Sequence, residues 1–508
     1  MKDILEVSNT DLDARIGILH TKHGKIEVPT FVPVVHPIKQ EISIDVIKRL
    51  GFDLVITNAY ITMKYYGKEI NESIHNIINF DKSIMTDSGG YQVLEYGDLD
   101  VDYDEVARFE SRIKSDIAVP LDKPTGFNID RGRAEEYVRK TLEASEHTIK
   151  IADSDTIWVG PIQGGKYLDL IEYSSRRLDR LGYEMFALGS PTEVMEAYDF
   201  RLLAEMIITA KRSIPLNKPL HLFGAGNPLT IPLAIALGCD TFDSASYMLY
   251  AKDDRYMLSN GTININDISY LPCTCFVCSN YKASELVSLP KKERSIEIAK
   301  HNLCMIKREV DAVKEAIMEG RLWEYVIQKS RSHPKLFAAN YILKDIGSLT
   351  PLHKKHAIFF MDSIDQYRPE ARRFRKMVRK IKYSSDLLIL IPEQDEHPLY
   401  ATSIYSRLKS ISKNSLIAYY SPYLGIVPEE LSDLFPAAHH LTPSKEFNIG
   451  EFPTFKEAFL DFVRYNHFNN IIILAEHSLM RFINEYDIKC KMVKSYDELL
   501  DAIIQYNI

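Results

Sequence analysis

The sequence predicts a (β/α)8 TIM barrel followed by a smaller α/β domain. Short apolar runs rich in β-branched residues alternate with segments of helical spacing, and successive runs begin roughly 20–40 residues apart. Each of these runs ends in small or polar residues. The chain has 508 residues, which is long for one domain. Because the pattern changes near residues 340–350, we expect a barrel domain at 1–340 and a second domain at 341–508.

The N-terminal part supplies the expected strands in order. Residues 14–19 and 26–31 are expected to form short strands around a turn at 22–24. The runs expected in the barrel are 54–58, 83–87, 117–122, 157–163, 185–189, 220–224 and 239–243. An open doubly wound sheet is the alternative, but no G-x-G-x-x-G motif follows the first strand.

Polar and glycine residues stand where the expected strands end, and in a TIM barrel these ends meet at one mouth. They are Asp87, Asp122, Gln163, Gly189, Gly224 and Asp243. Each of them singly is explained by a strand-end turn, and Asp87-Ser88-Gly89-Gly90 alone has the composition of one. Two carboxylates at one mouth suit cleavage at an anomeric carbon, where one attacks and the other handles the proton. Asp243 and Asp87 are the candidates.

Other residues of the mouth suit recognition of a purine. The Asp122 carboxylate could accept from the N1 and N2 donors of guanine, and Gln163 could serve the O6 and N7 side. Tyr91 and Phe223 are candidates to stack on a base, although an aromatic residue more often packs in a core. Gly164 and the glycines at 165, 189 and 224 would let the backbone approach a ligand.

Three cysteines and a distant histidine predict a metal site in an insertion at about 270–305. The pattern is Cys273-x-Cys275-x-x-Cys278, followed by His301. Three thiolates and one imidazole fill a tetrahedral zinc shell and leave no position for water, so the zinc would be structural. Cys304 is a rival fourth ligand. The alternative to a metal site is that the three cysteines are simply buried and that His301 is unrelated to them.

The second region has its own strand-like runs and no catalytic constellation. The runs are 357–360, 387–391, 415–419 and 470–474, and helices are expected at 454–465 and 496–506. Residues 368–382 are strongly basic. A solvated helix face explains that segment, and a contact with tRNA is the alternative hypothesis.

Composition excludes several classes of protein. The formal net charge of −8 does not indicate a general nucleic-acid binder, although a local basic face remains compatible with it. No apolar run approaches the roughly 18 residues of a membrane span, and the N-terminus lacks an apolar signal core. The cysteine spacing suits a metal site in a reducing compartment. We therefore expect a cytoplasmic protein.

Four motifs, in this order along the chain, resemble those of the tRNA-guanine transglycosylase family. They are Asp87-Ser88-Gly89-Gly90-Tyr91-Gln92, Gln163-Gly164-Gly165, Phe242-Asp243-Ser244-Ala245-Ser246-Tyr247 and the cysteines with His301. The resemblance covers roughly residues 10–335. It is strongest to the archaeal branch, which residues 187–191, 250–256 and 331–336 resemble.

The resemblance implies a reaction and a role for each residue. Archaeal members exchange guanine 15 in the D-arm of tRNA for the base preQ0, a step towards archaeosine. Asp243 would be the nucleophile on ribose C1′ and Asp87 the acid/base, although which carboxylate attacks stays open. Asp122 and Gln163 would read the guanine edge. The rest of the pocket would be lined or stacked by Gly164, Leu188, Gly189, Tyr91 and Phe223.

The resemblance also implies partners. Members of the family commonly form homodimers, and many archaeal members end in a PUA domain that grips tRNA. No PUA signature is recognisable in the sequence, so we expect either a separate PUA-domain polypeptide or another means of gripping tRNA.

Three other functions compete with this one. They are an archaeosine synthase-like paralogue, a non-catalytic tRNA-binding subunit and a barrel glycosidase acting on a nucleoside. Asp87 and Asp243 in intact motifs count against the first two. The glycosidase explains neither the cysteines nor the second domain.

Overall fold

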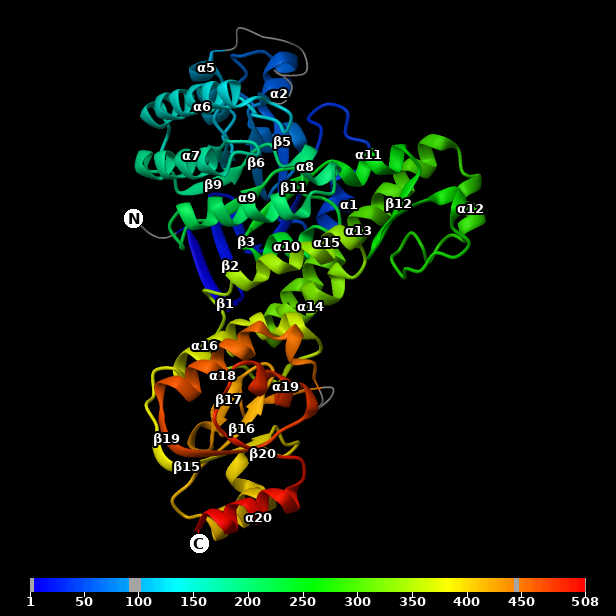
Figure 1. Cartoon of the computed structure of the whole chain (residues 1–508). Coiled ribbons are helices and arrows are strands. Elements are labelled where there is room, and N and C mark those ends of the chain that lie inside the picture. The colour runs from blue at the N-terminus through cyan, green and yellow to red at the C-terminus, as the bar shows by residue number, and fades with distance from the viewer. Residues whose placement is uncertain (1–3, 91–101, 443–446, 508) are drawn as a thin grey trace. The chain divides into compact units, whose positions relative to one another are not determined.

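The computed structural model describes residues 4–90, 102–442 and 447–507. The chain divides into two compact units, residues 1–342 and 343–508 (Figure 1). Tyr91, expected to stack on a base, lies outside the described residues. No helix in the described ranges is long and apolar enough to cross a membrane.

The first unit is built around eight parallel strands, which confirms the predicted barrel (Figure 1). In chain order they are β4 (Thr30–Pro33), β5 (Leu54–Asn58), β6 (Ser83–Asp87), β7 (Ile117–Ala118), β8 (Ile157–Ile162), β9 (Met185–Leu188), β10 (Leu220–Leu222) and β11 (Thr241–Ser244). β11 pairs with β4, and the sheet closes where the Val35 N–H donates to the Ile56 carbonyl at 2.8 Å. The alternative of an open doubly wound sheet is therefore wrong.

The first barrel strand differs from expectation. Residues 26–31 were expected to form one strand, but they are divided between β3 (Gly24–Val28) and β4. Pro29 stands between the two and has no N–H to donate to a ladder. β3 instead joins β1 (Leu5–Asp11) and β2 (Ala14–Thr21) in a three-stranded antiparallel sheet.

The interior of the barrel is filled by alternate residues of its strands. Val32, Ile56, Met85, Val159 and Ala187 belong to one buried cluster. The same cluster includes residues 5, 19, 26 and 28 of the antiparallel sheet, which therefore covers the end of the barrel where the strands begin.

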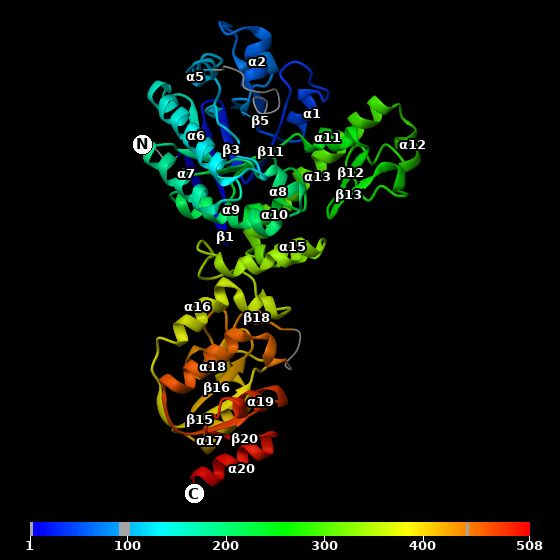
Figure 2. The same ribbon diagram turned by 45° about the horizontal axis from the view of Figure 1, so that its top comes forward.

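Helices surround the barrel, as Figures 1 and 2 show. They are α1 (Ile44–Arg49), α2 (Ala59–Tyr66), α3 (Ile74–Ile78), α5 (Tyr103–Arg112), α6 (Arg131–Ile151), α7 (Leu168–Leu181), α8 (Thr192–Glu196), α9 (Phe200–Ser213), α10 (Ile231–Ala236) and α11 (Ser246–Lys252). The insertion follows, with β12 (Arg255–Leu258), β13 (Gly261–Asn264) and α12 (Ala283–Ser288) projecting to one side (Figure 2). The long α13 (Lys291–Glu319) returns the chain to the barrel, and α14 (Leu322–Ser330) and α15 (Pro334–Ala339) complete the unit.

The second unit is an α/β domain with its own core. Its five-stranded sheet has the order β17 (Gly425–Pro428), β16 (Leu416–Ser421), β15 (Ser384–Pro392), β19 (His467–Leu474) and β20 (Lys491–Val493), with β17 antiparallel. A two-stranded pair, β14 (Ile358–Phe359) and β18 (His440–Leu441), lies outside it. The helices are α16 (Pro369–Val378), α17 (Ser403–Ile411), α18 (Pro453–Tyr465), α19 (His477–Glu485) and α20 (Tyr496–Asn507).

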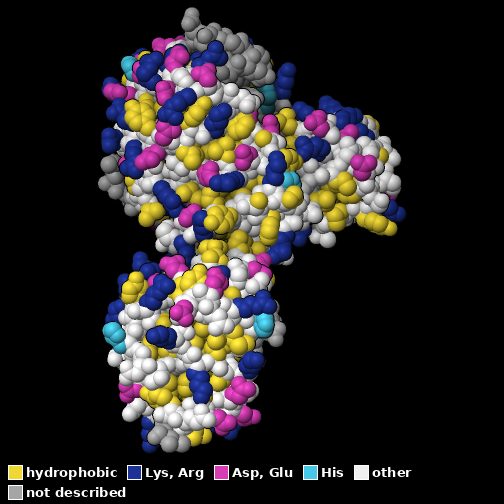
Figure 3. All heavy atoms as spheres, viewed as in Figure 1, with side chains coloured by type: hydrophobic (Ala, Val, Ile, Leu, Met, Phe, Trp, Pro, Cys, Tyr) yellow, Lys and Arg dark blue, Asp and Glu magenta, His cyan; other side chains and the backbone are white. Residues whose placement is uncertain are grey.

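Most arginines of the basic segment are not free to form a solvated face. Arg372 and Arg373 donate to backbone carbonyls of the loop at 344–351, and Arg375 donates to the carbonyls of Gln366, at 2.6 Å, and Tyr423. These three arginines therefore do not form the solvated helix face expected for residues 368–382, because each guanidinium donates to carbonyls of its own domain. Figure 3 shows basic and acidic side chains interspersed over the face that it draws.

Candidate active site at the barrel mouth

The residues expected at strand ends lie together at the mouth. Side chains alternate along a strand, so the positions after the buried interior residues also point inward. Ile56 is followed two residues later by Asn58, Met85 by Asp87, and Ala187 by Gly189. Asn58 and Asp87 are direct neighbours in the β5–β6 register. The apolar layers inside the barrel are therefore followed by a polar layer at the C-terminal ends of the strands.

Asp122 and Gln163 form a fixed pair in this polar layer. The Gln163 Nε2 donates to Asp122 Oδ2 at 2.5 Å. Its Oε1 accepts from the Thr125 N–H and Oγ1, both at 3.0 Å, and from Ser190 Oγ at 3.1 Å. Because Oε1 is held by three donors, the orientation of the amide is determined, and the remaining hydrogen of Nε2 is the group that it can offer to a ligand.

Two glycines make room for this pair. A Cβ on Gly189 would lie 2.2 Å from Gln163 Nε2, and a Cβ on Gly90 would lie 2.3 Å from Asp122 Oδ1. Both distances are shorter than any real contact. The second glycine of Asp87-Ser88-Gly89-Gly90 is therefore required by the neighbouring carboxylate, beyond the turn that it forms.

Asp243 is held through one of its two oxygens. Oδ1 accepts from the Gly224 N–H and from His221 Nε2, each at 3.1 Å. The His221 Nδ1 lies 2.9 Å from Thr241 Oγ1, so the hydroxyl can donate to Nδ1 while Nε2–H donates to Asp243. Oδ2 is the oxygen left to react. Sequence reasoning missed His221, although a histidine within an apolar strand run was a signal for it.

Asp87 has different surroundings. Burial, together with repulsion from the carboxylates of Asp122 and Asp243, raises the pKa of Asp87 to about 7 against the opposing hydrogen bonds from the Gly89 N–H and Asn58. Asn58 Nδ2 donates to its Oδ2 at 3.3 Å. Asp87 can therefore exchange a proton near neutral pH, as a general acid/base must.

Two further carboxyl groups share this environment. Burial raises the pKa of Asp122 to about 6, although the hydrogen bond from Gln163 opposes the shift. Burial also raises the pKa of Glu110 on α5, whose Oε1 accepts from Thr86 Oγ1 at 2.7 Å. Glu110 is fully buried behind β6 and was not identified from the sequence.

The remaining expected pocket residues lie in different places. The Phe223 ring meets His221 edge-on, with ring centroids 4.7 Å apart. Leu188 is fully buried, and Met185 and Ala187 are the β9 residues of the interior cluster. Alternation therefore turns the Leu188 side chain away from the interior, and only its backbone can line the mouth. A Cβ on Gly164 would lie 2.6 Å from the Ile171 nitrogen, so this glycine serves packing of α7.

Cys273, Cys275, Cys278 and His301 come together and could hold a metal ion. The His301 Nδ1 lies 3.5 Å from Cys275 Sγ and 3.3 Å from Cys278 Sγ, and the two sulfurs are 3.6 Å apart. Bonds of normal zinc length give edges of about 3.5–3.8 Å in a tetrahedral shell, so the donors fit that ion. The His301 Nε2 donates to the Met257 carbonyl at 2.8 Å, which turns Nδ1 towards the sulfurs.

One protein family matches the part of the chain that contains both the barrel and the cysteine cluster. Residues 10–335 match the family described as queuine tRNA-ribosyltransferase. The chain is 42% identical over 451 residues to the tRNA-guanine(15) transglycosylase of Sulfolobus acidocaldarius, covering 86% of this chain and 89% of the relative.

Two other relatives carry the same name. The protein from Methanocaldococcus jannaschii is 38% identical over 494 residues, which cover 92% of this chain and 74% of that protein. The protein from Saccharolobus solfataricus is 37% identical over 488 residues, which cover 93% of this chain and 96% of the relative. The similarity therefore extends beyond the barrel into the second unit.

Proposed function

The chain belongs to the queuine tRNA-ribosyltransferase family, and from this premise we propose that it is a tRNA-guanine(15) transglycosylase. It exchanges a guanine of tRNA for another base and is a pentosyltransferase. The observation that carries the proposal is the pair of carboxylates at one mouth, Asp243 and Asp87, in different surroundings. The exchanged base is proposed to be preQ0, at position 15 of the D-arm, on the path to archaeosine.

In the first half-reaction the target guanosine leaves the tRNA fold and enters the mouth. Asp243 Oδ2 attacks ribose C1′, the bond from C1′ to N9 of guanine breaks, and a ribosyl ester of Asp243 forms. Asp87 in its acid form gives a proton to the departing guanine. A pKa of about 7 keeps a useful fraction of Asp87 protonated at neutral pH.

In the second half-reaction the proton returns. The incoming base loses its N9 proton to the Asp87 carboxylate, N9 bonds to C1′, and the bond to Asp243 breaks. The tRNA backbone remains intact, and Asp87 ends protonated as it began. This sequence needs no external energy source, because one glycosidic bond replaces another.

We propose that Asp122 and Gln163 read the Watson–Crick edge and the O6 side of the base. Asp122 Oδ1 lies beside Gly90, which has no side chain. The free Nε2 hydrogen of Gln163 supplies the donor for O6. Phe223 supplies one face on which the base stacks, and we propose that Tyr91 supplies the other.

We propose that the cysteine–histidine cluster holds a structural Zn2+. Four protein donors would complete its shell, so the metal cross-links the loop after β13 to α13 and supplies no reaction step. Removing it with a strong chelator should lower the thermal midpoint of unfolding, and adding Zn2+ back should restore it. An unchanged midpoint after verified metal loss would contradict a structural role.

The remaining partners are proposals of the same kind. A homodimer, a separate PUA-domain polypeptide that strengthens the grip on tRNA, and a cytoplasmic location all suit an enzyme that modifies tRNA. Sedimentation of the purified chain tests the dimer. Measurement of tRNA affinity with and without a PUA-domain protein tests the second partner.

One experiment tests the function. The protein is incubated with tRNA and labelled guanine or preQ0, base incorporation is followed, and the protein–tRNA adduct is isolated under denaturing conditions and mapped. We expect incorporation, and an adduct on Asp243 that Asp243→Asn abolishes. Asp155→Asn, which changes an exposed carboxylate at the opposite end of the barrel, is the control.

The outcomes separate the alternatives. An Asp243→Asn variant that still forms an adduct through Asp87 would reverse the two roles. No incorporation and no adduct with the wild type would favour the non-catalytic tRNA-binding subunit. Chemistry only on a base already installed would favour the archaeosine synthase-like paralogue.

A further inference from the structure

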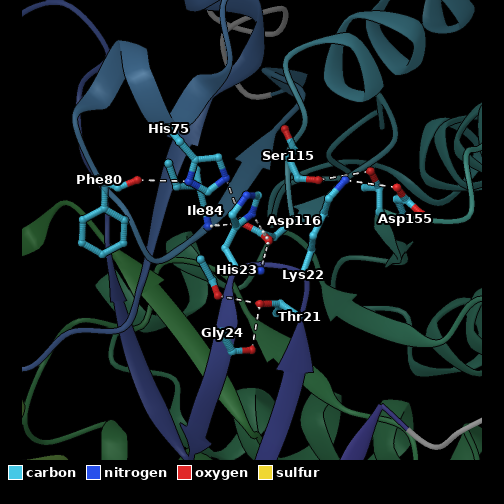
Figure 4. Close-up of polar contacts among 12 residues, drawn as sticks. Thr21, Lys22, His23, Gly24, His75, Phe80, Ile84, Ser115, Asp116 and Asp155 are labelled. Atoms are coloured by element: carbon cyan, nitrogen blue, oxygen red, sulfur yellow. Dashed lines mark hydrogen bonds and ion pairs between the residues drawn. The ribbon is translucent and has the colours of Figure 1, made fainter.

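Two histidines and an aspartate gather at the end of the barrel opposite the mouth (Figure 4). His23 lies in the turn between β2 and β3, His75 is in α3, and Asp116 immediately precedes β7. The Asp116 side chain is fully buried, whereas those of His75 and His23 are 11% and 34% exposed. Three segments that are distant in sequence thus bring their polar groups to one point.

Asp116 makes two kinds of contact. Its Oδ1 accepts from the backbone N–H of His23 at 3.0 Å, and its Oδ2 accepts from the Ile84 N–H at 2.8 Å. These bonds use one lone pair of each oxygen and tie the turn to β6. The other side of the carboxylate faces the imidazoles, with His23 Nδ1 2.8 Å from Oδ1 and His75 Nε2 3.2 Å from Oδ2.

The His75 ring has a defined orientation. Its Nδ1 lies 3.0 Å from the Phe80 carbonyl, which only accepts, so Nδ1 carries a hydrogen. The Nε2 is buried and makes no hydrogen bond of good geometry to any residue that the structure describes. In the neutral ring it presents a lone pair to a carboxylate, and such a contact requires a cation between the two atoms. A backbone carbonyl holding the far nitrogen is the usual support of a metal-binding histidine.

His23 and His75 bring their rings together beside the same carboxylate. The two ring centroids are 3.9 Å apart, and one nitrogen of each ring and one oxygen of Asp116 lie within 4.8 Å of one another. The Asp116 oxygens already accept from two backbone N–H groups, and each oxygen also faces one imidazole nitrogen. One divalent ion at this point could bind both imidazoles and the carboxylate.

We propose that His23, His75 and Asp116 bind a divalent transition-metal ion, at a site separate from the cysteine–histidine cluster. Two imidazoles and a carboxylate suit ions such as Zn2+, Co2+ or Ni2+. Three protein ligands leave a position for water on the exposed side of His23. The ion fastens the β2–β3 turn and α3 to the start of β7, and so closes the end of the barrel that the antiparallel sheet covers.

A second cluster shows why histidines beside a carboxylate do not by themselves require a metal. In the other unit His440 donates from Nδ1 to the Pro436 carbonyl at 2.9 Å, and its Nε2 directly contacts Glu393. The pKa of His440 is raised, because burial is outweighed by the Glu393 charge and hydrogen bond. A proton already joins this pair, and His397 lies 4.0 Å from the same oxygen of Glu393.

Cobalt binding to the full chain tests the proposal. Co2+ in the cysteine cluster gives intense thiolate-to-cobalt charge-transfer absorption, whereas Co2+ bound by His23, His75 and Asp116 gives only weak ligand-field bands. We expect two equivalents per chain, the second without charge transfer and with micromolar or tighter affinity. The variant His23→Gln/His75→Gln should lose the second equivalent and keep the first.

The matched control is His20→Gln. His20 stands on the same hairpin and lies 3.3 Å from the single carboxylate of Glu6, without a second histidine. It should retain both equivalents. Once the cysteine–histidine cluster is filled, a second equivalent of Zn2+ should raise the thermal midpoint of this control and of the wild type but not that of the double variant. If the double variant does not fold, His23→Gln alone, which changes a partly exposed side chain, should bind the second ion at least tenfold more weakly.

Two results would overturn the proposal. One is a wild type that binds only the cobalt with charge transfer. The other is a second equivalent that is bound equally by the wild type and by the histidine variants.

Discussion

His221 shows how one side chain can decide the use of a carboxylate. It is fully buried in β10 and engages the same oxygen of Asp243 as the Gly224 N–H. In the proposed reaction the other oxygen is the one that attacks ribose. We therefore propose that His221 is a positioning residue, which acts through Asp243.

Replacing His221 should slow the reaction without weakening tRNA binding. Loss of a hydrogen bond to a charged group costs roughly 1.5–3 kcal/mol, which corresponds to about a 10–150-fold lower kcat. We expect His221→Ala to lower kcat by that amount with KM for tRNA nearly unchanged, and His221→Gln to recover part of the loss through its amide. A rise in KM alone, or equal losses in both variants, would show that His221 serves general packing.

The pH dependence of adduct formation should have two limbs. Asp122 must be ionised to accept from guanine, and its pKa is about 6, so the rate should rise as the pH passes that value. Asp87 must be protonated to release guanine, and its pKa is about 7, so the rate should fall above it. Because the carboxylates of Asp87, Asp122 and Asp243 repel one another, each limb of the pH profile reflects this group and not a single residue.

Single-turnover adduct formation between pH 5 and 9 measures these limbs, and roughly a tenfold loss per unit is expected well above the upper one. The residual rate of Asp87→Asn should lack the upper limb. A wild-type rate that continues to rise through pH 8 would show that Asp87 does not act as the acid in this step.

At the scale of elements, α16 illustrates how a basic sequence can be structural. Burial lowers the pKa of Arg375 to about 10, and the guanidinium donates to two carbonyls of its own domain. Any contact of this helix with tRNA therefore falls to exposed residues such as Lys376. Charge along a sequence does not reveal this division, because Arg375 reaches inward whereas Lys376, the next residue, is exposed.

Replacing Arg375 should destabilise the second unit. Arg375→Ala leaves two carbonyls without their donor, which costs about 1–3 kcal/mol. Lys376→Ala on the same helix is the control and should change the free energy of unfolding by less than about 0.5 kcal/mol. Denaturant unfolding followed by circular dichroism measures both, and equal effects of the two substitutions would contradict the assigned role of Arg375.

At the scale of the whole molecule, the chain consists of two units with separate cores. The second core is formed from residues between Ile358 and Ile503. The five-stranded sheet takes none of its strands from the first unit. Such a unit meets the conditions for folding alone.

Residues 343–508 expressed by themselves should therefore fold and unfold cooperatively. The midpoint should match one of the transitions of the full chain, measured by calorimetry. The fragment carries none of the mouth residues, so it should form no adduct with tRNA. A fragment that lacks a cooperative transition would show that the second unit depends on the first.

The sequence by itself determined the barrel, the polar residues at its strand ends and the cysteine–histidine group. Local sequence patterns indicate these features. They are the hydrophobic periods of strands and helices, the residue at which each apolar run ends, and the short spacing between the three cysteines. When an apolar strand of the barrel ends in Asp or Gln, that side chain is predicted to lie at the mouth. This prediction needs no knowledge of how the other strands are arranged.

Tertiary structure alone decided which groups meet. The pairing of His221 with Asp243, the clearance around Gln163 that requires Gly189, and the outward turn of Leu188 depend on the register between strands. The sequence did not separate β4 from β3, and β4 is identified as the eighth strand by its position between β11 and β5. His23, His75 and Asp116 meet only because the barrel closes. Contacts between segments far apart in sequence are set by packing of the whole fold, and no local pattern encodes them.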